Sequence, residues 1–194
     1  MNYLMWQDVI NLHGLSSPPV RAMLSNAVAT MGRATILEVG SYKGASAVAM
    51  CYRNDVAEIH CIDNHSEFGD TRAELRDTLL RFGLPNTIHD ADYFACRLGD
   101  LVGGTRFNVY FYDGPHDEEQ HARELSIALP HLADEFLYMV DDYSWPRVKR
   151  GCQCGLAELG SKVRVTKMNI YESERTNDAT GFWNGLMVAR CRKT

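Results

Sequence analysis

The 194-residue sequence lacks several features that would point to particular classes of protein. No apolar run approaches the roughly 20 residues that cross a bilayer, and the first residues do not resemble a secretory leader. Lys and Arg number 20 against 25 Asp and Glu, a net charge of −5, so a general nucleic-acid surface is not expected. We therefore expect a soluble, cytoplasmic protein that binds neither membrane nor nucleic acid.

Cysteine pairing signals are also missing. The six cysteines include no C-x-x-C pair and are spread through segments that read as helices and strands. Most are therefore expected to be small buried hydrophobes in a reducing compartment. Cys152 and Cys154 lie closest together, but two thiols alone are too few for a structural zinc site.

The stretch from Ile36 to Ser46 reads as strand, tight turn and helix. It lacks the middle glycine of a dinucleotide-binding G-x-G-x-x-G turn, because Tyr42 stands there. Its glycines, Gly40 and Gly44, allow close approach of a ligand, and the carboxylate of Glu38 offers an acceptor. The turn is therefore expected to hold a cofactor that has no pyrophosphate group. A plain β-α turn without a ligand is the competing interpretation.

Length and hydrophobic content suit a single domain over residues 1–194. Helical spacing over about 2–12 and 20–31 predicts a helical cap over residues 1–33, which covers part of the pocket, followed by a core over 34–194. Further helices are expected at 45–52, 67–82, 94–101, 117–132 and 146–159. A long loop over 172–184 carries Phe182 and Trp183 and is expected to form a lid or substrate wall.

Strand-like segments alternate with these helices at 35–39, 58–62, 87–89, 107–112 and 136–140, and two more follow at 162–171 and 186–191. Such alternation predicts a mostly parallel sheet, which binds ligands beyond the carboxyl ends of its strands. Acidic residues stand at the expected strand ends, which predicts one composite site there: Glu38, Asp63, Asp92, Asp113, Asp141 and Asp142. Asp63 has the offset of a ribose-binding acid, although a turn or helix cap would also explain it.

The last three of these carboxylates are expected to converge, because they follow neighbouring strands. Like charges at short range either raise a pKa or gather a cation. Asp113, Asp141 and Asp142 are therefore candidate ligands for Mg²⁺, or for Mn²⁺ or Ca²⁺. Helix capping and plain turns are the competing explanations.

The motif E-x-G-x-x-x-G from Glu38 to Gly44 resembles the first motif of class I S-adenosylmethionine-dependent methyltransferases. The segments from Tyr112 to His116 and from Val140 to Tyr143 resemble methyltransferase family 24 and the metal-dependent macrocin-type O-methyltransferases. The resemblance covers about residues 36–190. It implies a Rossmann-like α/β fold with a seven-stranded, mostly parallel sheet, helices on both faces and a C-terminal antiparallel hairpin.

The resemblance further implies that S-adenosylmethionine is the methyl donor and that a hydroxyl of a small sugar or phenolic molecule is the acceptor. The cofactor positions carry onto Glu38, Gly40, Ser41, Gly44, Asp63, Asp92 and Asp113, with Asp92 beside the adenine. The metal positions carry onto Asp113, Asp141 and Asp142. A homodimer is expected only because the resemblance to these families implies it.

Pro115 stands where such families commonly have their general base, so the base is expected to be His116, with Asp113 beside it. An imidazole near neutral pKa is suited to taking a hydroxyl proton. Two alternatives stay open: a cofactor-binding partner or regulatory protein without catalysis, and a nicotinamide-dependent oxidoreductase, which the missing glycine disfavours. Tyr143, Trp145 and Trp183 are candidates for the substrate wall or for rim packing.

Overall fold

The computed structural model describes residues 5–173 and 179–194. Seven strands form one sheet: β1 (Ala34–Val39), β2 (Val56–Asp63), β3 (Asn86–Asp90), β4 (Phe107–Tyr112), β5 (Leu132–Asp141), β6 (Val163–Tyr171) and β7 (Leu186–Lys193). The helices are α1 (Trp6–Ile10), α2 (Pro18–Ala29), α3 (Ala45–Cys51), α4 (Arg72–Arg81), α5 (Leu98–Val102), α6 (Glu118–Ala128) and α7 (Pro146–Glu158), with a 3₁₀ turn, η1 (Leu129–His131).

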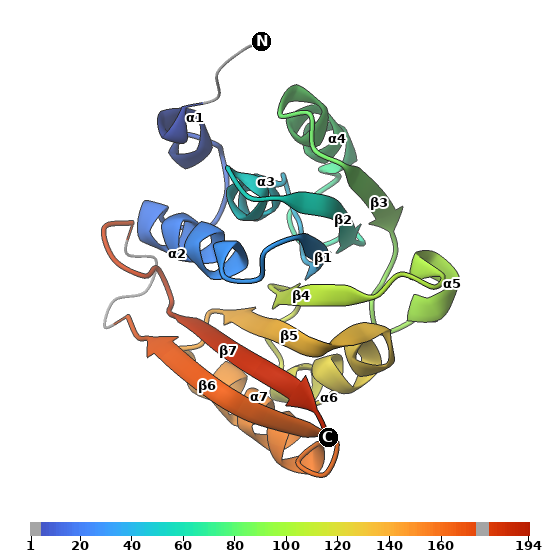
Figure 1. Ribbon diagram of the computed structural model, residues 1–194. Coiled ribbons are helices and arrows are strands. Elements are labelled where there is room, and N and C mark those ends of the chain that lie inside the picture. The colour runs from blue at the N-terminus through green and yellow to red at the C-terminus, as the bar shows by residue number, and fades with distance from the viewer. Residues whose placement is uncertain (1–4, 174–178) are drawn as a thin grey trace.

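The sheet has the order β3-β2-β1-β4-β5-β7-β6 (Figure 1). Strands β1 to β5 are parallel, and β7 lies antiparallel between β5 and β6. The expected Rossmann-like sheet with a C-terminal antiparallel hairpin is thus confirmed. The chain leaves β1 toward β2 and β3 on one side and returns to β4 and β5 on the other, so the strand order reverses between β1 and β4. Sheets of this type bind ligands at that reversal, outside the carboxyl ends of the strands.

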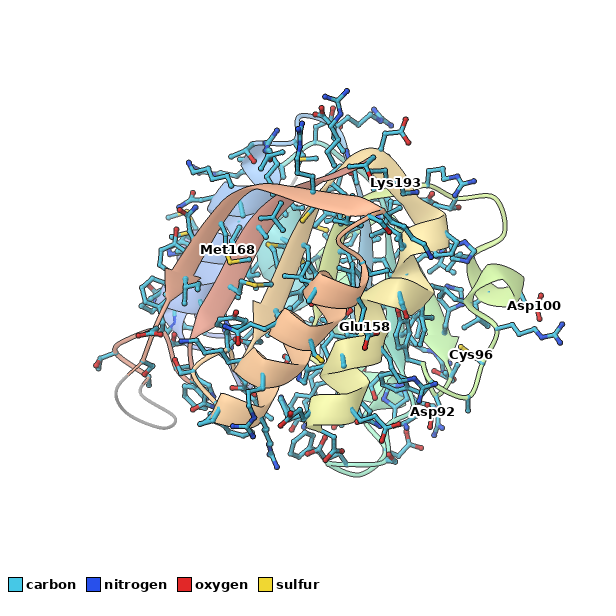
Figure 2. The ribbon with its side chains drawn as sticks, turned by 90° about the horizontal axis from the view of Figure 1, so that it is seen from below. Asp92, Cys96, Asp100, Glu158, Met168 and Lys193 are labelled. Carbon is cyan, nitrogen blue, oxygen red and sulfur yellow. The ribbon has the colours of Figure 1, made fainter. Side chains whose placement is uncertain are left out.

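Helices cover both faces of the sheet, as expected (Figures 1 and 2). One apolar core lies under α2, α3 and α4 and contains Leu24, Val48 and Leu79. The other lies under α5, α6 and α7, where α6 and α7 run side by side and contribute Leu125 and Val148. Buried residues run almost without a break along the central strands, as they do in parallel sheets covered on both faces.

Several helix boundaries differ from the sequence-based expectation. The helix expected over 20–31 spans Pro18–Ala29, and the one expected over 117–132 ends at Ala128 and is followed by η1. The first helix, expected over 2–12, spans Trp6–Ile10 in the described part, and residues 1–4 lie outside it. The helix expected from Glu67 begins at Arg72, because Gly69 adopts a left-handed φ of 80° just before it. The helix expected from Phe94 begins at Leu98, since the preceding residues form turns in which the Asp92 carboxylate accepts the backbone N–H of Phe94.

The segment before the sheet is held together by a buried arginine on α2. Arg21 is 2% exposed, and its guanidinium donates to the carbonyls of Val9, Ile10 and Leu12 and to the Ser16 hydroxyl. These bonds close residues 9–16 into a compact loop. α2 begins at Pro18 because Ser17 accepts the Val20 N–H as its N-cap.

The loop expected to form a lid, 172–184, falls partly on residues 174–178, which lie outside the described residues. Its C-terminal part is tied to the N-terminal segment, since the Ser17 hydroxyl donates to the carbonyl of Gly181 at 2.5 Å. Across residues 5–173 and 179–194, none of the helices has the length and apolar character to cross a membrane.

Candidate active site

A cavity of about 490 Å³ opens beyond the carboxyl ends of the parallel strands, within the size range of small-molecule sites. Its walls come from the turn after β1, the ends of β2 and β4, the segments after β3 and β5, and the N-terminal loop. Six predicted site residues line it: Gly40, Ser41, Asp63, Asp92, Asp113 and Asp142. The predicted base, His116, lines it as well.

Gly40 allows the turn after β1 to lie directly against the turn after β4. It has a φ of 85°, and a Cβ built on it would lie 1.9 Å from the carbonyl oxygen of Asp113. Its own N–H donates to the Ile62 carbonyl. The turn after β1 and the turn after β4 therefore touch at this residue, next to Asp113, which lines the cavity. The glycine brings these backbones together, and also lines the cavity as predicted.

Glu38 does not line the cavity, contrary to the expectation that its carboxylate faces the ligand. The side chain is fully buried beneath the turn, where Ser46 donates to Oε1 at 2.5 Å and the Cys61 thiol lies 3.5 Å from Oε2. Burial raises the pKa of this carboxyl to about 7. Glu38 therefore supports the start of α3 from beneath the turn. It does not face the cavity, so it is not positioned to contact a ligand there.

Gly44 also lies outside the cavity wall. It forms the N-cap of α3 in the left-handed conformation, with φ at 85°, and a Cβ there would lie 3.1 Å from Leu75 of α4. The glycine therefore serves the helix start and the packing of α3 on α4. Ser41, between the two glycines, lines the cavity from the turn itself.

Asp63 stands at the end of β2 and joins two loops. Its Oδ2 accepts the backbone N–H of Tyr42 at 2.7 Å, and its Oδ1 accepts that of His65 at 2.7 Å. A carboxylate has further lone pairs on each oxygen, so a diol can still be accepted. Asp92 lies beyond β3, with Oδ1 held by the N–H groups of Phe94 and Ala95.

Asp113, His116 and Asp142 form a cluster on the β4 and β5 side of the cavity. One ligand-type atom from each lies within 4.8 Å of the others. His116 Nε2 is 2.6 Å from Asp142 Oδ2 and 3.8 Å from Asp113 Oδ1. The expected convergence of carboxylates after β4 and β5 is therefore present, with an imidazole between them.

Asp141 is absent from this cluster and from the cavity wall, so the predicted triad is not assembled as expected. Its side chain is 3% exposed, and Oδ1 accepts the N–H of Asp142 at 3.0 Å. Burial, with the nearby charges of Asp113 and Asp142, raises the pKa of Asp141 well above its ordinary value. Asp142 adopts a φ of 55°, a backbone conformation uncommon for residues other than glycine and often found at functional sites.

The expected near-neutral imidazole at His116 is not found. Burial by itself lowers the pKa of His116, but the adjacent carboxylates of Asp113 and Asp142 raise it overall to about 10. Burial raises the pKa of Asp113 to about 6, although its bond to His116 lowers it. The two carboxylates thus favour the protonated form of the His116 imidazole.

Aromatic and basic side chains close the outer wall. Trp145 and Trp183 line the cavity, and the ring of Trp145 lies 5.0 Å from that of His116. Arg147 at the start of α7 lines it too and lies over the Trp145 ring at 5.1 Å. Tyr143 is 2% exposed and packs in the core beneath, so it is not part of the wall.

Sequence reasoning missed the lining residues of the N-terminal loop and the arginine behind them. Gly14, Leu15 and Ser16 line the cavity, and Arg21 holds this loop in place. The available signal was an arginine next to Val20 and Leu24 on the apolar face of α2, a position where an unpaired charge would be costly.

A sequence profile of methyltransferase family 24, described as a methyltransferase domain, matches residues 37–143. The match covers more than half of the chain and includes the end of β1, the turn after it, and the cluster at Asp113, His116 and Asp142. The chain belongs to this methyltransferase family. The resemblance seen in the motifs at Glu38, Asp113 and Asp141 is thereby confirmed.

Solved structures share the fold of this methyltransferase. An O-methyltransferase from Bacillus cereus, solved in complex with SAH, matches with a TM-score of 0.69 and 15% identity, over 95% of this chain and 89% of that one. A putative O-methyltransferase from Klebsiella pneumoniae gives 0.66 and 16%, over 95% and 88%. The O-methyltransferase TomG from Streptomyces achromogenes, in complex with SAM, gives 0.67 and 16%, over 92% and 81%.

No curated protein sequence matches this methyltransferase closely enough to count as a relative. At identities near 16% the structural neighbours establish the fold, and the family match establishes the class of enzyme. The class I methyltransferase fold and the assignment as an S-adenosylmethionine-dependent methyltransferase are confirmed at this level. The acceptor and the roles of individual residues are matters for proposal.

Proposed function

We propose that the chain transfers the methyl group of S-adenosylmethionine to a hydroxyl of a small sugar or phenolic molecule. The observation that carries this proposal is the division of one cavity into two chemically different halves. Asp63 and Asp92 lie after β2 and β3, and the Asp113, His116 and Asp142 cluster lies after β4 and β5. Donor and acceptor would meet between them, at the reversal of strand order.

The charge of the cavity wall favours a cationic methyl donor over a dinucleotide. Its described lining has five carboxylates, at Asp63, Glu67, Asp92, Asp113 and Asp142, against two positive side chains, Arg147 and the protonated His116. A sulfonium is stabilised by such surroundings, whereas a pyrophosphate is repelled by them. In the proposed pose Asp63 accepts the ribose hydroxyls, Asp92 lies beside the adenine, and Ser41 contacts the amino-acid end.

The acceptor half supplies proton removal and positioning. Methyl transfer needs the hydroxyl oxygen in line with the methyl group and an acceptor for its proton. His116 with a pKa near 10 holds its proton at neutral pH, so it orients Asp113 and Asp142 in that state. We assign proton acceptance to the Asp113 carboxylate, held in place by the protonated His116 beside it, with Trp145 and Trp183 enclosing the acceptor.

The donor set of the same cluster fits a divalent cation. Two carboxylates and an imidazole within 4.8 Å suit Mn²⁺, whereas Mg²⁺ would be held by the carboxylate oxygens alone. Asp113, Asp142 and, for Mn²⁺, His116 would hold the ion. When bound, the ion would lower the pKa of the acceptor hydroxyl and fix its position. The cation competes with the His116 proton for the two carboxylates.

Methyl transfer from isotope-labelled S-adenosylmethionine to a panel of sugars and catechols tests the proposal, with and without Mg²⁺ or Mn²⁺. The Asp142→Asn variant should lower turnover at least about tenfold, because one acidic member of the cluster loses its charge. Asp77→Asn, an exposed site on α4, is the matched control and should leave turnover unchanged.

Binding of the methyl donor without transfer to any acceptor, in wild type as in Asp142→Asn, would favour the alternative of a non-catalytic partner protein. Transfer that is unaffected by chelation of divalent ions would remove the metal part of the proposal and leave the methyltransferase. Binding of NADH in place of S-adenosylmethionine would support the oxidoreductase alternative and refute the proposal as a whole.

A further inference from the structure

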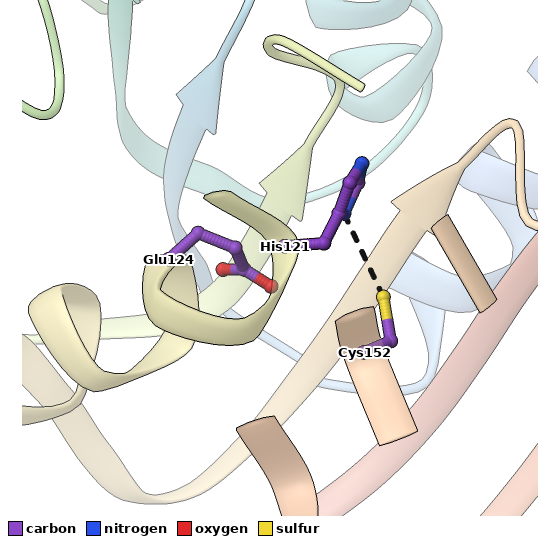
Figure 3. Close-up of side chains that lie close together, drawn as sticks. All are labelled: His121, Glu124 and Cys152. Atoms are coloured by element: carbon purple, nitrogen blue, oxygen red, sulfur yellow. Dashed lines mark hydrogen bonds between the residues drawn. The ribbon is translucent and has the colours of Figure 1, made fainter. Parts of the chain in front are cut away.

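A second cluster of metal-binding side chains lies in the interior, between α6 and α7 (Figure 3). His121 and Glu124 project from α6 and Cys152 from α7, and one ligand-type atom from each lies within 4.8 Å of the others. All three side chains are at most 1% exposed. None of them lines the cavity or belongs to the Asp113 cluster.

The cluster is incompletely bonded as it stands. Glu124 Oε1 accepts the hydroxyl of Tyr138, whereas Glu124 Oε2 is buried without a hydrogen-bond partner in the described part of the chain. Tyr110, close by, donates its hydroxyl to Tyr93. A buried polar atom left unpaired is costly, so this oxygen marks a place where a further partner would stabilise the fold.

The geometry and the chemistry of the donors suit zinc. His121 Nδ1 and Cys152 Sγ are 3.6 Å apart. Usual Zn–N and Zn–S bond lengths in a tetrahedral site place such atoms about 3.5 Å apart. A thiolate, an imidazole and a carboxylate together are typical of zinc, whereas Mg²⁺ and Ca²⁺ prefer oxygen alone. The bond from Tyr138 to Glu124 would fix the carboxylate from outside, as supporting residues do around metal ligands.

The backbone fixes the spacing of the two helices at this point. A Cβ on Gly151 would lie 2.4 Å from the Glu118 carbonyl oxygen and 2.6 Å from the His121 Cβ. A Cβ on Gly155 would likewise lie 2.5 Å from the Ala122 carbonyl oxygen. The two glycines therefore allow α7 to pack directly against α6. The three proposed ligands face one another across this close helix–helix contact.

We propose that His121, Glu124 and Cys152 provide three protein ligands of a zinc site that joins α6 to α7. The two helices begin just after the catalytic cluster, α6 after His116 and α7 after Asp142. The His121 ring also packs edge-on against Tyr112 at the end of β4, at 4.9 Å. The ion would hold the helices that position the catalytic side chains, and it would take no part in methyl transfer.

Burial also shifts the pKa values of the three groups. Burial raises the pKa of Glu124 to about 8 and the pKa of the Cys152 thiol far above its ordinary range. Burial also lowers the pKa of His121 to about 3. Binding of Zn²⁺ would displace the thiol proton of Cys152, because the thiolate is the metal ligand.

Cobalt substitution tests the site, because Co²⁺ bound to a thiolate gives a charge-transfer band in the near ultraviolet. Protein produced in cobalt-supplemented medium should contain one thiolate-bound Co²⁺ per chain and show this band. The band also distinguishes the two clusters, since Asp113, His116 and Asp142 contain no sulfur. Cys152→Ser should abolish it, and Cys154→Ser, an exposed position two residues further along α7, should retain it.

Zinc should also raise the melting temperature of wild type and of Cys154→Ser, but not that of Cys152→Ser. If Cys152→Ser does not fold, His121→Gln takes its place in both comparisons. Absence of the band from wild type, or equal loss of it in Cys154→Ser, overturns the proposal. The outcome is independent of the methyl-transfer assay, which reports on the other cluster.

Discussion

Replacing Glu38 by glutamine tests whether this buried carboxyl supports the fold or contacts the methyl donor. The substitution keeps the shape of the side chain and removes its charge. In the structure Glu38 is fully buried, bonded to Ser46 and separate from the cavity wall. We therefore expect a pH-dependent change in stability and little change in affinity for S-adenosylhomocysteine.

The magnitude follows from the pKa of the buried carboxyl. Burial raises it from an ordinary value of 4.5 to about 7, so between these values the native chain holds one proton more than the unfolded chain. The Glu38 contribution to stability is complete below pH 4.5 and is lost as the pH rises through 7. The slope is about 1.4 kcal/mol per pH unit, so the total loss is about 3 kcal/mol.

Urea unfolding measured across this pH interval gives the free energy of unfolding for wild type and Glu38→Gln. The difference between the two curves isolates Glu38 from other titrating groups, and it should shift by about 3 kcal/mol in favour of the variant as the pH rises. Glu158→Gln, at an exposed position near the end of α7, is the matched control (Figure 2). A pH-independent difference, together with a tenfold or greater loss of affinity, would show that Glu38 faces the ligand after all.

Two further substitutions test the backbone of the site. Gly40→Ala should destabilise the chain by about 3 kcal/mol or more in urea unfolding, because the new Cβ meets the Asp113 carbonyl. Gly83→Ala, with a φ of 62° and open space around it, should cost only about 1 kcal/mol, and equal costs would contradict the account. Arg21→Met should reduce amide-exchange protection of residues 9–16 and leave β4 protected, because three carbonyls lose their donor. Uniform loss of protection would show that Arg21 supports the whole fold and not this loop.

The sheet could be predicted because its signals are local. Short apolar runs ended by an acidic residue recur between helical segments, and such alternation permits few topologies. The same logic placed Asp63, Asp92, Asp113 and Asp142 at one edge of the sheet, where they line the cavity. Their common location follows from the parallel direction of β1 to β5.

The sequence pattern did not predict the direction in which individual side chains point. Glu38 lies one residue before the end of β1 and Asp141 ends β5, yet both side chains turn inward, because adjacent residues of a strand face opposite sides. His121 and Glu124 occupy helix positions that the sequence presents as ordinary polar sites, and only the packing of α6 on α7 buries them. The high pKa of His116 likewise depends on Asp142, which is 26 residues away along the chain.

The most direct test of the central claim is a calorimetric titration of the chain with S-adenosylhomocysteine, in wild type and in Asp63→Ala. The account predicts one binding site per chain, with affinity at least about tenfold weaker in Asp63→Ala because two ribose hydroxyls lose their acceptor. Asp77→Ala on α4 should bind as wild type does. Absence of binding to wild type would contradict the methyltransferase account itself, and equal affinity in Asp63→Ala would contradict the proposed position of the methyl donor in the cavity.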